Sequence, residues 1–149
     1  MAGSFRSVHL DDVPEVAPDN EDDVRWRPLR YHLGIEAFGT NAFAADAGER
    51  VIERHDELGG DGGVEPVDQQ EMYVVVRGAA RFTVGGETFD APAGEVVFVH
   101  DPAAVREAFA TQDRTLVLAV GGAVGSAFTP SQWERRETAK ADVPVLGDG

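Results

Sequence analysis

The chain has 149 residues, of which 42% are hydrophobic, and a formal net charge of −14 at pH 7. These values fit one folded domain and argue against a disordered chain, while so acidic a surface would repel nucleic-acid backbones and anionic membranes. Cysteine is absent, which excludes disulfides, thiolate metal ligands and cysteine nucleophiles. The sequence has no run of roughly 18 apolar residues and no apolar secretory signal at its start, so we expect a cytoplasmic protein.

Residues 1–28 predict a polar N-terminal arm. Phe5–Leu10 has the composition of a short strand, whereas residues 11–23 are acidic and contain two prolines, which is typical of loops. Trp26 follows between two arginines. We expect its ring to cover the apolar end of the domain that comes next.

Residues 29–128 predict an all-β domain. Short runs rich in Val, Ile, Phe, Tyr and Thr alternate with glycine or charged turns, as in the strands of a sandwich or barrel. The unbroken apolar runs Val74–Val76 and Val96–Val99 predict strands buried on both faces, and Gly85–Gly86 predicts a two-residue hairpin turn. The predicted strands are Leu29–Phe38, Ala42–Asp46, Arg50–His55, Met72–Arg77, Ala80–Val84, Thr88–Ala91, Val96–Val99, Val105–Ala110 and Thr115–Val120.

Two segments interrupt this strand pattern. Asp56–Gln70 is glycine-rich and acidic and predicts a surface loop. Residues 129–149 predict a C-terminal helix and a tail, with Thr129 as the N-cap and Gln132 at the capping-box position. Trp133 is expected to anchor this helix on the domain.

Two spaced motifs run through residues 48–94. The first motif contains a glycine, a histidine, and then a glutamate at the start of a predicted strand that ends in glycine. The second motif is a glycine followed by a Pro-x-Gly turn. The residues that form them are Gly48, His55, Glu71, Gly78, Gly86, Pro92 and Gly94. In this order and spacing they resemble the two sequence motifs of the cupin superfamily.

The resemblance implies a small single-domain cupin, a double-stranded β-helix or jelly-roll barrel with a short C-terminal helix. Residues 1–28 would then be an N-terminal arm, residues 29–128 the barrel, and residues 129–149 the C-terminal helix and tail. Such barrels commonly pair, so we expect a homodimer with a small-molecule ligand, and neither a nucleic acid nor a membrane as partner.

The resemblance also implies a metal site, which this sequence retains only in part. Cupin sites combine several imidazoles with one carboxylate, and Val97 occupies the histidine position of the second motif. The predicted metal ligands are therefore His55, Glu71 and His100, holding iron, manganese, nickel or zinc. A barrel without any metal is an equal alternative.

The predicted ligand-binding residues are Glu71, Tyr73, Arg81, Phe98 and Arg106. Glu71 and Tyr73 share one face of a strand, because side chains alternate along it. An inward glutamate is expected to pair with an arginine, either Arg106 or Arg81. An arginine in place of a metal-binding histidine would instead hold an anion, such as a carboxylate ligand.

Three functional hypotheses remain open from the sequence. The first is a binding module that holds a small organic ligand in the barrel without a complete catalytic metal site. The second is a metal-dependent enzyme, of dioxygenase, isomerase or lyase type, with a divergent histidine and glutamate ligand set. The third is a regulatory partner protein that uses the acidic loop. Whether the protein is an enzyme is not decided by these motifs.

Overall fold

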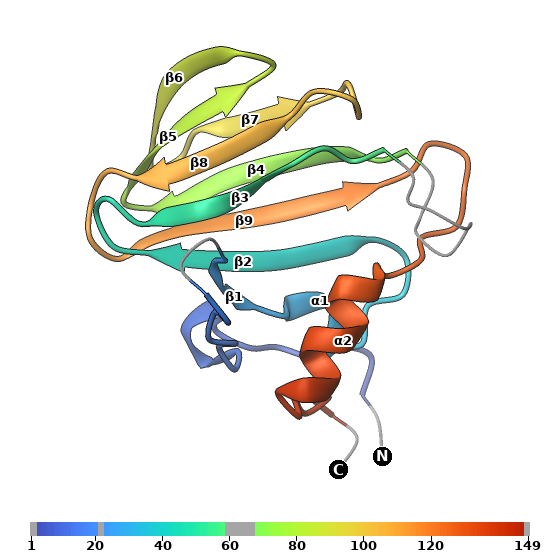
Figure 1. Ribbon diagram of the computed structural model, residues 1–149. Helices are drawn as coiled ribbons and strands as arrows, with labels where there is room; N and C mark the ends of the chain where they lie inside the picture. The colour runs from blue at the N-terminus through green and yellow to red at the C-terminus, as the bar shows by residue number, and fades with distance from the viewer. Residues whose placement is uncertain (1–2, 21–22, 59–67, 148–149) are drawn as a thin grey trace.

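Two antiparallel sheets face each other and enclose the core in this computed structural model, which describes residues 3–20, 23–58 and 68–147 (Figure 1). The order is β1-β2-β9-β4-β7 in one sheet and β3-β8-β5-β6 in the other, which confirms the predicted all-β class. The first sheet contains β1 (Arg25–Arg27), β2 (Gly39–Ala45), β9 (Thr115–Gly122), β4 (Gln70–Arg77) and β7 (Val96–Val99). The second contains β3 (Arg50–His55), β8 (Arg106–Ala110), β5 (Ala79–Val84) and β6 (Glu87–Pro92).

The segments predicted as strands from residue 42 to residue 120 all form strands. The prediction of Leu29–Phe38 as a strand is wrong, because Leu29–Leu33 forms the helix α1. Gly34 ends this helix in the left-handed conformation, with a φ of 73°, and its N–H donates to the carbonyl of Tyr31. Phe5–Leu10 is not a strand either: Leu10 begins a short 3-10 helix, η1 (Leu10–Asp12).

The loop predicted over Asp56–Gln70 is shorter than expected. Gln70 already belongs to β4, and the N–H of Gln69 donates to the carbonyl of Glu57 at 3.1 Å. Residues 59–67 of the predicted loop lie outside the described residues. The two ends of the loop therefore meet beside the last residue of β3.

The C-terminal helix α2 (Gln132–Lys140) forms, but its N-cap is Ser131 rather than Thr129. The Ser131 hydroxyl accepts a hydrogen bond from the backbone N–H of Glu134 at 3.1 Å, which satisfies one of the free N–H groups of the first turn. None of the helices in the described part of the chain is long and apolar enough to cross a bilayer.

Replacing Ser131 with alanine removes this cap. We expect the free energy of unfolding to fall by about 1 kcal/mol, as for other side-chain N-caps. Urea denaturation would measure the change, and Thr129→Ala is the matched control, because Thr129 does not cap the helix. A larger loss in Thr129→Ala than in Ser131→Ala would contradict this assignment.

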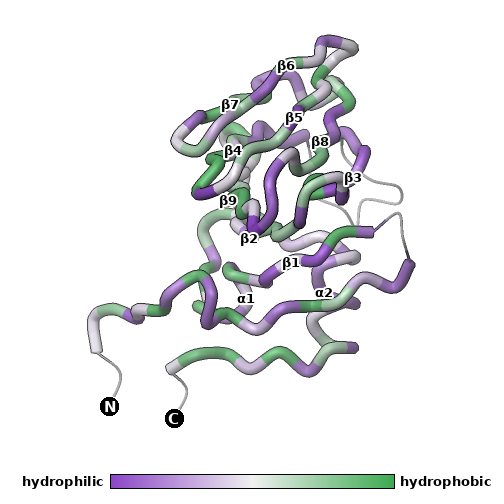
Figure 2. The backbone as a smooth tube through the Cα atoms, turned by 90° about the vertical axis from the view of Figure 1, so that its left-hand side faces the viewer, coloured by the Kyte–Doolittle hydropathy of each residue, from purple (hydrophilic) through white to green (hydrophobic). Residues whose placement is uncertain are grey.

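The first and last described segments of the chain and both α-helices form a layer at the end of the molecule opposite β6 (Figures 1 and 2). Trp26 of β1 is 2% exposed, and its ring lies 4.5 Å from that of Trp133 on α2, measured between ring centroids. Val16, Val24 and Val143 complete this cluster. Trp133 thus anchors α2 beside the barrel, as the sequence predicts.

The apolar runs in β4 and β7 are buried on one face only, contrary to the prediction. Tyr73 and Val75 point into the core, and so do Val97 and Val99. Their neighbours point outward: Val96 is 53% exposed and Phe98 55% exposed. The reason is that the second sheet covers one face of the first, while no described element covers these outward side chains.

Two turns explain the glycines of the motifs. Gly85 and Gly86 both have positive φ, 56° and 86°, and connect β5 to β6 as predicted. Gly78 connects β4 to β5 with a φ of 73°, and a Cβ there would lie 2.3 Å from the Thr115 hydroxyl oxygen. The position therefore requires glycine for both its conformation and its packing.

Candidate functional site

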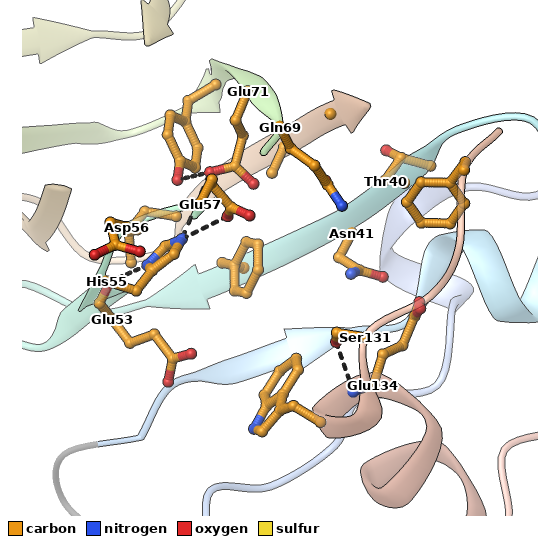
Figure 3. A pocket seen from close by; sticks show the side chains of 18 of the residues that line it. Thr40, Asn41, Glu53, His55, Asp56, Glu57, Gln69, Glu71, Ser131 and Glu134 are labelled. Carbon is orange, nitrogen blue, oxygen red and sulfur yellow. Dashed lines mark hydrogen bonds and ion pairs between the residues drawn. The ribbon is translucent and has the colours of Figure 1, made fainter. Parts of the chain in front are cut away.

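A cavity of about 320 Å³ opens between the inner face of the five-stranded sheet, the end of β3 and the helix α2 (Figure 3). Its floor is formed by the small residues Ala119 and Gly121 of β9, which lie between β2 and β4. Tyr73 and Glu71 stand beside them on β4, and Asn41 stands on β2. Short side chains on the central strand thus leave room for a ligand between longer neighbours.

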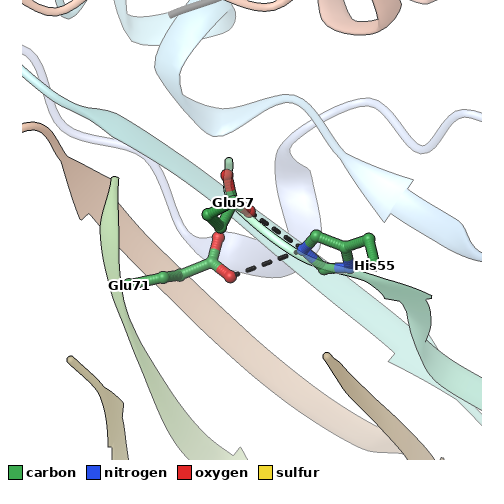
Figure 4. Close-up of side chains that lie close together, drawn as sticks. All are labelled: His55, Glu57 and Glu71. Atoms are coloured by element: carbon green, nitrogen blue, oxygen red, sulfur yellow. Dashed lines mark hydrogen bonds and ion pairs between the residues drawn. The ribbon is translucent and has the colours of Figure 1, made fainter. Parts of the chain in front are cut away.

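His55 ends β3 and points its two ring nitrogens at hydrogen-bond acceptors. Nδ1 lies 2.6 Å from the backbone carbonyl oxygen of Glu53, and Nε2 lies 2.9 Å from Oε1 of Glu57. Nε2 also lies 3.6 Å from Oε1 of Glu71 (Figure 4). A backbone carbonyl and ionised carboxylates only accept hydrogen bonds, so this geometry favours an imidazolium with a proton on both nitrogens of His55.

Glu71 is held from several sides. The Tyr73 hydroxyl donates to its Oε1, and Nη1 of Arg106 donates to the same oxygen at 3.2 Å. The Arg106 side chain is fully buried and also donates to the carbonyls of Ala104 and Asp101. This confirms the expected pairing of Glu71 with Arg106.

The pKa values follow from this arrangement. Burial alone would lower the pKa of His55, but the hydrogen bonds and charges of Glu57 and Glu71 raise it to about 10. Burial works against ionisation of Glu71 too, yet His55, Tyr73 and Arg106 hold its pKa below the usual value. Burial raises the pKa of Glu57, and burial together with the charge of Glu71 raises that of Tyr73.

A second polar group lies where α2 meets the cavity. Nε of Arg30 donates to both carboxylate oxygens of Glu134, at 3.1 and 3.0 Å. Burial raises the pKa of Glu134, although Arg30 and Asn41 act in the opposite direction. Oδ1 of Asn41 is buried without a hydrogen-bond partner among the described residues. This end of the cavity is therefore lined by a paired carboxylate and an amide, and the amide oxygen is covered by protein.

The structure does not bring the other predicted residues to the cavity. Arg81 is exposed and pairs with Asp90 at 2.8 Å. Phe98 points outward from β7, and His100 is exposed with its ring 6.2 Å from that of Phe98. Arg106 contacts Glu71 from behind and does not line the cavity. Of the predicted metal ligands, only His55 and Glu71 lie together.

Sequence reasoning missed several residues that line the cavity. Glu57 follows the end of β3, where no periodic pattern marks it as inward. Glu53 precedes His55 by two positions, so strand alternation does place it on the same face as His55. Asn41 is marked by the strand alternation of β2, since Phe43 two residues later also lines the cavity. Glu134 comes from α2, and its position depends on packing that local sequence does not specify.

No family model and no curated protein matches the sequence. Solved structures do match. A cupin protein from Bacteroides fragilis is 17% identical over 87% of this chain and 92% of that chain, with a TM-score of 0.59. A sugar phosphate isomerase from a cupin superfamily, from Silicibacter pomeroyi, is 17% identical over 84% of this chain and 77% of that chain, with a TM-score of 0.60. This chain has the cupin fold. A predicted oxalate decarboxylase from Thermotoga maritima with the same fold is 18% identical over 78% of this chain and 97% of that chain, with a TM-score of 0.59.

The cupin fold raises the question of a metal, and the donor set here fits one poorly. His55, Glu57 and Glu71 offer ligand atoms within 4.8 Å of one another, which is compact enough for a small divalent ion. However, Oε1 of Glu71 already accepts from Tyr73 and from the fully buried Arg106 guanidinium. A metal ion at this oxygen would lie beside a fixed positive charge. These residues fit a proton on His55 better than a metal ion.

Proposed function

We propose that this protein binds a small organic molecule in the cavity between the barrel and α2, and that it does so without a resident metal. The observation that carries the proposal is the closed charge network behind the cavity. His55 and Arg106 are positive, Glu57 and Glu71 are negative, and the four are linked by hydrogen bonds and ion pairs. Their charges balance without a further cation, so the network serves as a rigid polar wall. We place this activity in the cytoplasm.

The shape and lining of the cavity support binding. It combines apolar side chains such as Phe43 and Trp133 with a few polar groups, which is typical of small-molecule sites. A carboxylate ligand is not what this lining favours, because no arginine or lysine lines the cavity among the described residues. Arg106, the expected anion-binding residue, is occupied by Glu71.

A metal-dependent enzyme is the second candidate, favoured by the compact cluster of His55, Glu57 and Glu71. Metal analysis of protein purified without a histidine tag separates the two. We expect no stoichiometric metal, and no rise in melting temperature with Mn²⁺, Fe²⁺, Ni²⁺ or Zn²⁺, because only an ion that binds the native state stabilises it. Stoichiometric metal that is lost in Glu71→Ala would overturn the metal-free proposal.

We further propose that two copies of the chain pair through the outer face of β9, β4 and β7. Most of the outward side chains there are apolar, and β7 is an edge strand of its sheet. Arg77 lies at the end of this face on β4 and is paired with Asp11. Since the chain carries a net charge of −14, a second copy can approach most readily over a face with so few charges. The apolar side chains of this face are Met72, Val74, Val76, Val96, Phe98, Leu118 and Val120.

Replacing Phe98 with arginine tests this pairing. We expect the wild type to be a dimer in light-scattering chromatography and Phe98→Arg to dissociate, with the dimer dissociation constant raised more than roughly tenfold. Phe5→Arg is the control, because Phe5 is 81% exposed and lies outside this face. A monomeric wild type, or a Phe98→Arg dimer as tight as the wild type, would refute the proposal.

A further inference from the structure

Among the described residues that line the cavity, Glu53 is a partly buried carboxylate that neither the charge network nor Arg30 pairs. It lines the cavity from β3 and is partly buried. Its backbone carbonyl accepts from His55, but no described residue donates a hydrogen bond to its carboxylate or lies within ion-pair distance of it. The segments outside the described residues contain no lysine, arginine or histidine that could pair with it.

The described residues that line the cavity carry more acidic than basic groups. Glu53, Asp56, Glu57, Glu71 and Glu134 bring five carboxylates to the cavity, against the single imidazolium of His55 and no lysine or arginine among the described lining residues. Glu57 and Glu71 are neutralised by the network, and Glu134 is paired with Arg30. Asp56 is exposed at the rim and caps the N–H of Leu58. Among the described lining residues, the partly buried carboxylate without a hydrogen-bond or ion-pair partner is therefore Glu53, and burial raises its pKa, so a cation beside it would favour its ionised form.

The rest of the lining suits an apolar body. The aromatic side chains of Phe43, Phe128 and Trp133 face the cavity, and aromatic faces attract organic cations as well as apolar groups. These aromatic side chains stand on a different wall from Glu53. A ligand that reaches both walls would pair a cation with a carboxylate and bury an apolar body against the rings.

We propose that the cavity takes a small organic amine, with its ammonium group on Glu53 and its apolar body against the aromatic side chains. This inference rests on the proposed function, since it names the class of ligand for the same cavity. An anion would face carboxylates without a compensating cation. A neutral ligand would leave Glu53 covered and unpaired, which costs free energy.

Three probes of the same length test the charge preference: 1-hexylamine, 1-hexanol and hexanoate, each titrated into the full-length protein at physiological ionic strength and followed by NMR. We expect the amine to bind at least roughly tenfold more tightly than the alcohol, which corresponds to one ion pair, and hexanoate not to bind. Glu53→Gln should lose this preference and keep its affinity for the alcohol. Glu87→Gln, which removes an exposed carboxylate from the β5–β6 hairpin, should retain it.

The outcomes separate this inference from the proposed function. If hexanol binds in the cavity as tightly as hexylamine, or if Glu53→Gln binds the amine as well as the wild type does, the amine preference is wrong while ligand binding stands. If none of the probes shifts signals of cavity residues, both proposals fail. Should Glu53→Gln not fold, the comparison of the three probes on the wild type still decides the charge preference.

Discussion

Replacing Arg106 with alanine is expected to lower the free energy of unfolding by roughly 3–5 kcal/mol, the usual loss when one partner of a buried ion pair is removed. The Arg106 side chain is fully buried, and its loss leaves Glu71 without its guanidinium partner. It also removes the donor to the Ala104 carbonyl, whereas the Asp101 carbonyl still accepts from the N–H of Ala104. Urea denaturation of both proteins measures the difference.

Arg81→Ala is the matched control, because the sequence alone allows either arginine to pair with Glu71. Arg81 pairs with Asp90 on the surface, where solvent screens the interaction, so no measurable change in stability is expected. The double variant Glu71→Met with Arg106→Met removes both charges together and should recover much of the loss. A loss in Arg106→Ala no larger than in Arg81→Ala would contradict the assignment of this pair.

Replacing His55 with glutamine is expected to change how stability depends on pH. The pKa of His55 rises from its ordinary 6.5 to about 10 in the folded protein. The folded state therefore holds a proton that the unfolded chain releases above pH 6.5, and this stabilisation, on the order of a few kcal/mol, is fully present below that pH. It decreases as the pH rises and is lost when the pH passes about 10.

Unfolding of the wild type and of His55→Gln between pH 6 and pH 10 measures this effect. The wild type should be more stable than the variant at the acid end of this range, and the gap should narrow steadily toward the alkaline end. Glutamine keeps a donor for Glu57 but cannot carry the charge. Parallel stability curves for the two proteins would show that His55 holds no extra proton.

The strands and turns of the barrel can be predicted from the sequence, because each depends on a pattern within a few consecutive residues. Alternating burial and glycines at positive φ place most strands and the β5–β6 hairpin correctly. The same alternation places Arg81 outward, since Ala80 and Phe82 on either side are buried. In an unbroken apolar run, alternation does not show which residues point inward. The sequence therefore does not predict that Phe98 points outward. It also does not predict that Val99 points inward and that His100, the next residue, points away from the site.

The sequence predicts the candidate site only in part, because the residues of the site come from segments that share no sequence pattern. Glu71 and Tyr73 follow from one strand, and Arg106 follows from the need of a buried carboxylate for a partner. Glu57 lies beyond the end of β3, and Glu134 reaches the cavity through the packing of Trp133 on Trp26. Such placements depend on contacts between distant segments.

The protonation of His55 at neutral pH is the most direct test of the account, because a proton shared with Glu57 and Glu71 takes the place that a metal would need. Nitrogen-15 NMR of the imidazole, with His55→Gln to assign its signals, reports the state of each ring nitrogen. We expect Nδ1 and Nε2 both to carry protons at pH 8, and added Zn²⁺ to leave their signals unchanged. A neutral ring, or an Nε2 signal that shifts stoichiometrically with Zn²⁺, would contradict the account.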